Sequence, residues 1–145
     1  MESPVGDTAF CESEVDLRVT KALRIIDAIA ELPDEHCALH LLRYQMRRME
    51  YTARTTPFGC CSNALGRFEN GTRVAYGKIV GKFPSDDVWA QVTLPVRSGG
   101  LGLRSMQAIA PAACYSSRAA TWQRWPYIQL TLPLKTIQCV TLNNS

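Results

Sequence analysis

The sequence predicts a mainly α protein, a small helical bundle of about four to five helices with an irregular or extended C-terminal tail. Three observations lead to this prediction. Apolar residues recur every three or four positions over long stretches, which is the spacing of one helix face. Proline and glycine lie between these stretches, where helices end. The composition, 46% hydrophobic and 20% charged over 145 residues, is typical of one folded domain with its own core.

The first predicted helix runs from about Glu12 to Ala30. We expect Ser13 to cap its N-terminus and Pro33 to end the segment, because proline cannot continue the helical hydrogen-bond ladder. Its apolar face follows spacings of four, four, three and four residues and consists of Val15, Val19, Leu23, Ile26 and Ala30.

The second predicted helix opens at Leu32-Pro33-Asp34-Glu35 and runs to about Tyr51. Proline suits a first helical position, and acids in the first turn complement the helix dipole. The short connection predicts that the first two helices are antiparallel neighbours. Pro57 and Gly59 then predict a loop over Thr52 to Gly59. The apolar stripe of this second helix consists of Leu39, Leu42, Met46 and Met49.

A third helix is predicted from Cys61 to about Val80, although its glycines also allow two shorter helices broken near Gly71. The segment from Gly81 to Pro84 predicts a turn. Ser85, followed by two acids, predicts the cap of a short helix through Trp89.

The remainder divides into a link, a last helix and a tail. Leu94 to Gly102 predicts an extended link with a glycine-rich turn. Ser105 can cap a last helix that continues toward Trp122, with Pro111 either kinking or restarting it. We therefore expect a helical region over residues 1–122 and a divergent tail over residues 123–145. The tail is expected to form either an edge strand or an unpartnered extension, since Lys135 is its only charged residue after Trp125.

The net charge of +3 hides an asymmetry. Residues 1–35 contain nine acids and three bases, whereas residues 36–145 contain thirteen bases and four acids. Twelve of the sixteen basic residues are arginine, whose planar guanidinium suits phosphate. The basic part is thus a candidate polyanion surface, and a solvated mixed-charge face is the alternative.

The sequence offers no convincing catalytic, metal or cofactor site. His36 and His40 share a helical face with Cys37 nearby, but zinc needs four ligands and no matching pair follows. Gly99 to Gly102 lacks the lysine of a phosphate-binding loop and predicts a tight turn, although Arg97 and Arg104 flank it. The adjacent acids Asp86 and Asp87 are explained by capping.

Neither a signal peptide nor a membrane span is expected. The acidic N-terminus lacks an apolar core segment, and no apolar run is long enough to cross a bilayer. We therefore expect an intracellular protein, nuclear or cytoplasmic and not secreted. Its six cysteines would be reduced thiols, and its Asn70-Gly71-Thr72 sequon would be without consequence.

Several segments, in order, resemble the region that follows the palm in reverse transcriptases of non-LTR retrotransposons. The most specific is Gly99-Gly100-Leu101-Gly102-Leu103-Arg104-Ser105, and the resemblance covers roughly Ser3 to Thr121. Two segments depart from the family pattern, with Phe58 in place of a second proline and Glu69 in place of aspartate. The other segments are Ser3 to Asp7, Leu32 to Arg43, Arg54 to Pro57, Phe68-Glu69, Trp89 to Gln91 and Ala110 to Ser117.

The resemblance implies a helical, thumb-like or connecting region that grips a primer-template duplex. Fingers, palm and the Tyr-x-Asp-Asp metal site would lie before Met1, so we expect a fragment of an RNA-directed DNA polymerase that is inactive by itself. Its expected partners are the missing palm and RNA or an RNA–DNA duplex, held through phosphates. The residues expected to contact nucleic acid are Arg43, Arg47, Arg48, Arg54, Arg73, Lys78, Arg97 and Arg104.

Two alternatives remain from the sequence alone. The chain could be a small helical protein-interaction domain, which would present apolar residues of its first two helices and its tail on the surface. It could also be a remnant open reading frame without a functional product.

Overall fold

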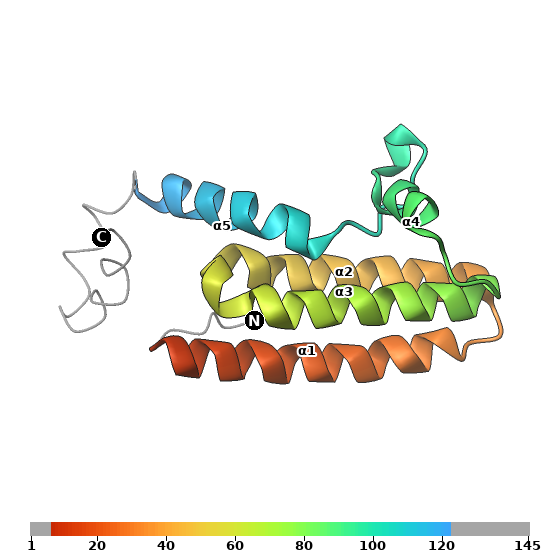
Figure 1. Cartoon of the computed structure of the whole chain (residues 1–145), viewed down its shortest axis with the longest axis horizontal. Helices are drawn as coiled ribbons and strands as arrows, with labels where there is room; N and C mark the ends of the chain where they lie inside the picture. The colour runs from red at the N-terminus through yellow and green to blue at the C-terminus, as the bar shows by residue number, and fades with distance from the viewer. Residues whose placement is uncertain (1–6, 123–145) are drawn as a thin grey trace.

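The computed structural model describes residues 7–122, and in this part of the chain five α-helices and one short 3₁₀-helix form a bundle without strands. Helices α1, α2 and α3 run alternately up and down side by side (Figure 1). Helix α5 runs roughly along α2 and α3 on the side away from α1, and α4 stands at one end of the bundle. The predicted mainly α fold is confirmed, and the expectations for residues 123–145 lie outside the described residues.

Helix α1 spans Thr8–Ala30 and begins four residues before the predicted start. The carboxylate of Asp7, not Ser13, caps it by accepting a hydrogen bond of 2.8 Å from the backbone N–H of Phe10. The earlier start has a packing reason, because buried Cys11 extends the apolar face that continues with Val15 and Val19.

Helix α2 spans Glu35–Thr55, so its cap is Asp34, and Pro33 lies before the helix and not in its first turn. Its C-terminus is four residues later than predicted, because buried Thr52 and Ala53 continue the core face. The predicted loop from Thr52 to Gly59 is therefore wrong and shrinks to Thr56 and Pro57. Thr56 is extended, as residues before proline usually are.

Helix α3 spans Phe58–Val80 as one continuous helix, so the alternative of a break near Gly71 is wrong. At Gly71 the absence of a side chain permits close packing between helices. A Cβ there would lie 2.2 Å from Cδ2 of Leu23 on α1. The turn predicted after α3 is confirmed, since Gly81 ends the helix with a left-handed φ of 75°.

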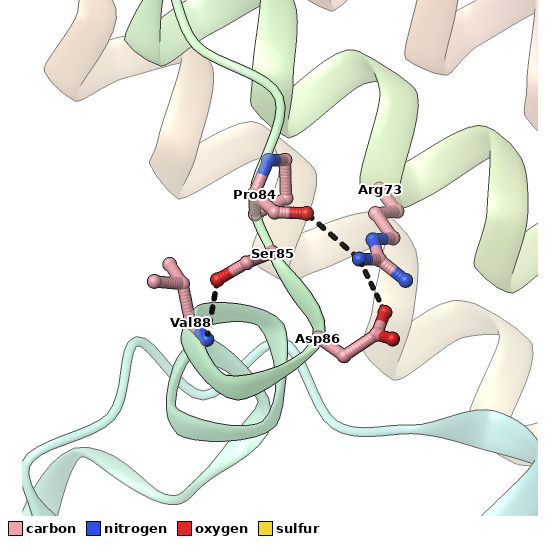
Figure 2. A network of polar contacts seen from close by, with 5 residues as sticks. All are labelled: Arg73, Pro84, Ser85, Asp86 and Val88. Carbon is pink, nitrogen blue, oxygen red and sulfur yellow. Dashed lines mark hydrogen bonds and ion pairs between the residues drawn. The ribbon is translucent and has the colours of Figure 1, made fainter.

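Helix α4 spans Asp86–Thr93 and is capped by Ser85, as predicted, although it extends one turn beyond Trp89. An arginine of α3 fixes its position. Nη2 of Arg73 lies 2.7 Å from the carbonyl oxygen of Pro84 and 2.8 Å from Oδ1 of Asp86 (Figure 2). The same guanidinium lies against the rings of Phe83 and Trp89.

Helix α5 spans Met106–Trp122 and continues through Pro111, so the alternative in which Pro111 restarts the helix is wrong. Ser105 accepts a hydrogen bond from the N–H of Ala108, as expected of a cap. The link before it contains the 3₁₀-helix η1, Val96–Ser98. Within residues 7–122, none of the helices combines the length and the apolar character needed to cross a bilayer.

The core joins all three long helices to α4 and α5. Leu42 and Met46 of α2 pack with Leu65 and Phe68 of α3, and each is almost completely buried. Thr72 is a buried polar residue whose hydroxyl donates a hydrogen bond to the carbonyl oxygen of Phe68, so the hydroxyl is satisfied within the core. This core fixes which face of α2 remains in solvent, and the candidate site lies on that face.

Candidate nucleic-acid interface

One face of α2 presents arginines to solvent beside the link that precedes α5. Arg43, Arg47 and Arg54 are spaced by four and seven residues, so they lie along one side of the helix. Met46 and Met49 alternate with them on the buried side, which forces the arginines outward. From Arg43 to Arg54 the helix rises about 16 Å.

The link supplies the opposite wall. Leu103 and Met106 are buried anchors on either side of Arg104, so that arginine faces out of the core. Hydrogen bonds from the N–H of Gly102 to Leu94 O (2.8 Å) and from Leu101 to Val92 O (3.1 Å) fold the link back on α4. Its shape is therefore fixed by backbone contacts.

Between these walls lies an open groove of about 720 Å³. Five of the eight predicted nucleic-acid residues line it, three from α2 and two from the link: Arg43, Arg47, Arg54, Arg97 and Arg104. Glu50 is the single acid among its lining residues, which leaves an excess of four positive charges. A groove of this size and charge can hold several phosphates of a polyanion.

Gly102 forms the turn of the link at the place where the link faces Arg43 of α2. Its φ is 73°, a left-handed conformation that other residues rarely adopt. A Cβ there would lie 3.6 Å from Nε of Arg43 on the facing helix. The positive φ therefore explains the glycine, as its place in the predicted glycine-rich turn indicates, and a Cβ at this position would make an ordinary contact with Arg43.

Glu50 holds arginines of both walls. Its Oε1 lies 2.6 Å from Nη2 of Arg54, one turn along α2, and 3.9 Å from Nη1 of Arg104 on the link. The glutamate side chain is 17% exposed, whereas the two arginines are 57% and 54% exposed. The carboxylate therefore lies beneath two guanidinium groups that still face solvent.

The other three predicted residues are not part of this groove. Arg48 faces a smaller pocket of about 170 Å³ between α1 and α2, together with Arg18 and Lys21. Arg73 is used internally to hold α4, and Nζ of Lys78 lies 3.7 Å from Oε1 of Glu31, the residue that follows α1. The structure thus divides the predicted set between one groove, a second pocket and contacts within the bundle.

Among the groove residues that the sequence did not predict, Glu50 and Tyr51 have side chains that can interact with the arginines or a ligand. Glu50 continues the spacing of Arg43 and Arg47 by three residues and precedes Arg54 by four, so helical periodicity alone could have placed it there. Tyr51 also lines the groove and is 39% exposed. An aromatic ring beside arginines can stack on a base or a sugar.

The described residues offer nothing for a metal. Over residues 7–122 no group of three or more His, Cys, Asp or Glu side chains is close enough to hold an ion. Asp86 ion-pairs with Arg73 and Asp87 lies in the first turn of α4, so both acids have structural explanations. The groove can bind and position an anion, and it presents no nucleophile with an adjacent base.

Comparisons of this chain with protein families, with curated proteins and with solved structures gave no match.

Proposed function

We propose that this chain grips an RNA–DNA duplex through phosphate contacts, as a post-palm module of a retrotransposon-type reverse transcriptase without catalytic activity of its own. The observation that carries the proposal is the convergence of Arg43, Arg47 and Arg54 with Arg97 and Arg104 on one groove. The two walls come from segments more than forty residues apart in the chain. Arginines spread at random over the surface would not gather in one groove.

The chemistry of the groove favours contacts that do not depend on base sequence. Guanidinium groups form paired, charge-assisted hydrogen bonds with phosphate oxygens. Arginine contacts to the backbone position a duplex, whereas base contacts specify its sequence. The groove is open along α2 and lies over side chains that the core holds in place, so a strand can lie along it with little rearrangement.

The experiment is a binding titration of purified chain with a labelled short RNA–DNA hybrid at several salt concentrations. The groove has an excess of four positive charges and can neutralise about four phosphates. This number predicts a slope of log K against log salt of about −3 to −4. The double variant Arg43→Gln with Arg47→Gln should reduce affinity at least about tenfold and the slope by about two.

A matched control removes the same charge elsewhere. Arg24→Gln with Arg118→Gln lies on exposed parts of α1 and α5, outside the groove. This control should lose much less affinity than the groove variant. Equal losses in both variants, or binding that ignores salt, would contradict the proposal.

A second candidate is a protein-interaction domain. The observation that favours it is a set of large apolar side chains on α1 and α2 that are each more than one third exposed, namely Phe10, Leu17, Ile25, Leu41, Tyr44 and Tyr51. Concentration-dependent self-association in sedimentation, without any salt-dependent binding of the hybrid, would favour this second candidate.

A further inference from the structure

Glu50 places a negative charge in the middle of the basic groove, where simple electrostatics predicts that it repels phosphate. The residue is nevertheless the least exposed partner of each ion pair that it forms there. Its contacts join two elements that are distant in sequence, because Arg54 belongs to α2 and Arg104 to the link before α5. The groove therefore has one carboxylate within ion-pair distance of an arginine on each of its walls.

We propose that Glu50 is a positioning residue that aligns Arg54 and Arg104 for a phosphate ligand, so that the groove binds more tightly with this acid than without it. The inference rests on the proposed function, since it names a residue that shapes the same groove. Its distinctive consequence is that removing a negative charge from an anion-binding groove weakens binding.

The geometry supports this role at Arg54. Its guanidinium has five N–H donors, and the contact with Glu50 engages one terminal nitrogen at 2.6 Å. More than half of the arginine side chain remains exposed, so donors are left for a ligand. A long side chain fixed before binding loses less conformational entropy when the ligand arrives.

The contact with Arg104 is looser, at 3.9 Å, and lies at the outer limit of an ion pair. The charge of Glu50 attracts the Arg104 guanidinium toward the carboxylate that Arg54 also contacts. The backbone on both sides of Arg104 is already fixed by buried Leu103 and Met106. On that wall, Glu50 therefore needs to restrict only the rotation of the Arg104 side chain.

Exposed ion pairs usually contribute little to stability, because both partners are well solvated when apart. Glu50 differs from the exposed acids of this bundle, such as Glu12, in being mostly buried beneath its partners. A mostly buried carboxylate keeps its charge satisfied only while an arginine covers it. The same requirement that keeps Arg54 over Glu50 keeps the Arg54 guanidinium among the groove-lining residues.

The test compares Glu50→Gln with Glu12→Gln, which makes the same change in net charge at an exposed residue of α1 that does not line the groove. The probe is the labelled RNA–DNA hybrid, and the measured quantities are affinity and its salt slope. Glu50→Gln should weaken binding about threefold to tenfold and lower the slope by about one. Glu12→Gln should leave affinity unchanged or slightly stronger.

A double-mutant cycle separates positioning from a general structural effect. In a background of Arg54→Gln and Arg104→Gln, the change Glu50→Gln should no longer weaken binding, because its partners are absent. If Glu50→Gln proves too unstable to study, Glu50→Asp keeps the charge and shortens the side chain by one methylene. A loss of affinity in that variant comes from geometry and supports the proposal.

The possible failures are distinguishable. If wild-type chain binds the hybrid with the expected salt slope and Glu50→Gln binds as tightly or more tightly, positioning by Glu50 is overturned and the groove survives. If Glu50→Gln weakens binding equally in the double-arginine background, positioning is also overturned. If wild-type chain does not bind, the proposed function fails and this inference fails with it.

Discussion

Gly100 lies directly against Leu94. A Cβ on Gly100 would be 2.2 Å from the carbonyl oxygen of Leu94, and 2.6 Å from that of Gln91. These atoms are backbone and cannot swing aside as the end of a side chain could. The residue is also buried, so the link that carries Arg97 and Arg104 folds back on α4 only with glycine at this position.

The first prediction follows from this contact. Gly100→Ala should destabilise the bundle by about 2–4 kcal/mol, because the backbone must move apart. It should also weaken binding of the hybrid, since the arginine wall shifts. Chemical denaturation and the binding titration measure the two effects. Gly59→Ala is the control, because nothing lies within 4 Å of a Cβ there and helix propensity predicts a gain of up to about 1 kcal/mol.

The second prediction concerns Arg73, which the sequence assigned to nucleic-acid contact. Its hydrogen bond to Pro84 O and its position over two aromatic rings make it a brace for α4 (Figure 2). Arg73→Gln should lower the free energy of unfolding by about 1–2 kcal/mol. Affinity for the hybrid should stay within about twofold of wild type. Unchanged stability with a large loss of affinity would contradict this role and show that Arg73 contacts the hybrid.

The third prediction concerns pH. The hydrogen bond from the backbone N–H of Cys37 lowers the pKa of Asp34 below its usual 3.8. A lowered pKa in the folded state means that the cap contributes stability above pH 3.8, and that this contribution is lost as the pH falls through the folded value.

The matching experiment compares wild type with Asp34→Ala and Asp34→Asn in thermal melts across pH. The difference in melting temperature between wild type and Asp34→Ala should narrow as the pH falls below 3.8. Asparagine also caps helices well, so Asp34→Asn should stay closer to wild type at neutral pH. If the difference in melting temperature between wild type and Asp34→Ala does not change with pH, the ionisation of Asp34 contributes nothing to stability.

Helical periodicity predicted most of the fold because it reports local geometry. Val15, Val19 and Ile26 were expected on the buried face of α1, and they are fully buried. The errors arose where tertiary contact overrides local preference. The low helix propensity of Gly71 suggests a break in α3. The helix is nevertheless continuous, and a small residue is favourable at this position because the side chain of Leu23 on α1 packs against it.

The groove could be predicted only in part. The spacing of Arg43, Arg47 and Arg54 places them on one face of α2 without any structure. That Arg97 and Arg104 lie opposite depends on how the link folds back on α4, which no local pattern encodes. Sequence alone also cannot distinguish an arginine that faces solvent from one that braces a helix, as Arg73 does.

The last prediction concerns Glu69 of α3, which anchors the start of α5. Its Oε2 accepts a hydrogen bond of 2.8 Å from the hydroxyl of Ser105 and one of 3.3 Å from the backbone N–H of Gln107. Ser105 in turn accepts from Ala108, so one carboxylate supports the whole first turn of α5. Since Arg104 directly precedes this turn, Glu69 also fixes one end of the groove wall.

Glu69→Ala should lower the free energy of unfolding by about 1–2 kcal/mol, because it leaves donors at a helix N-terminus without their acceptor. Hydrogen exchange should quicken first at amides 107–110 and stay slow in the core of α2. Affinity for the hybrid should fall, because the backbone beneath Arg104 is less fixed. Glu12→Ala, at an exposed position of α1, is the control and should leave stability, hydrogen exchange and affinity unchanged. Unaltered exchange at the start of α5 would mean that Ser105 caps the helix adequately without Glu69.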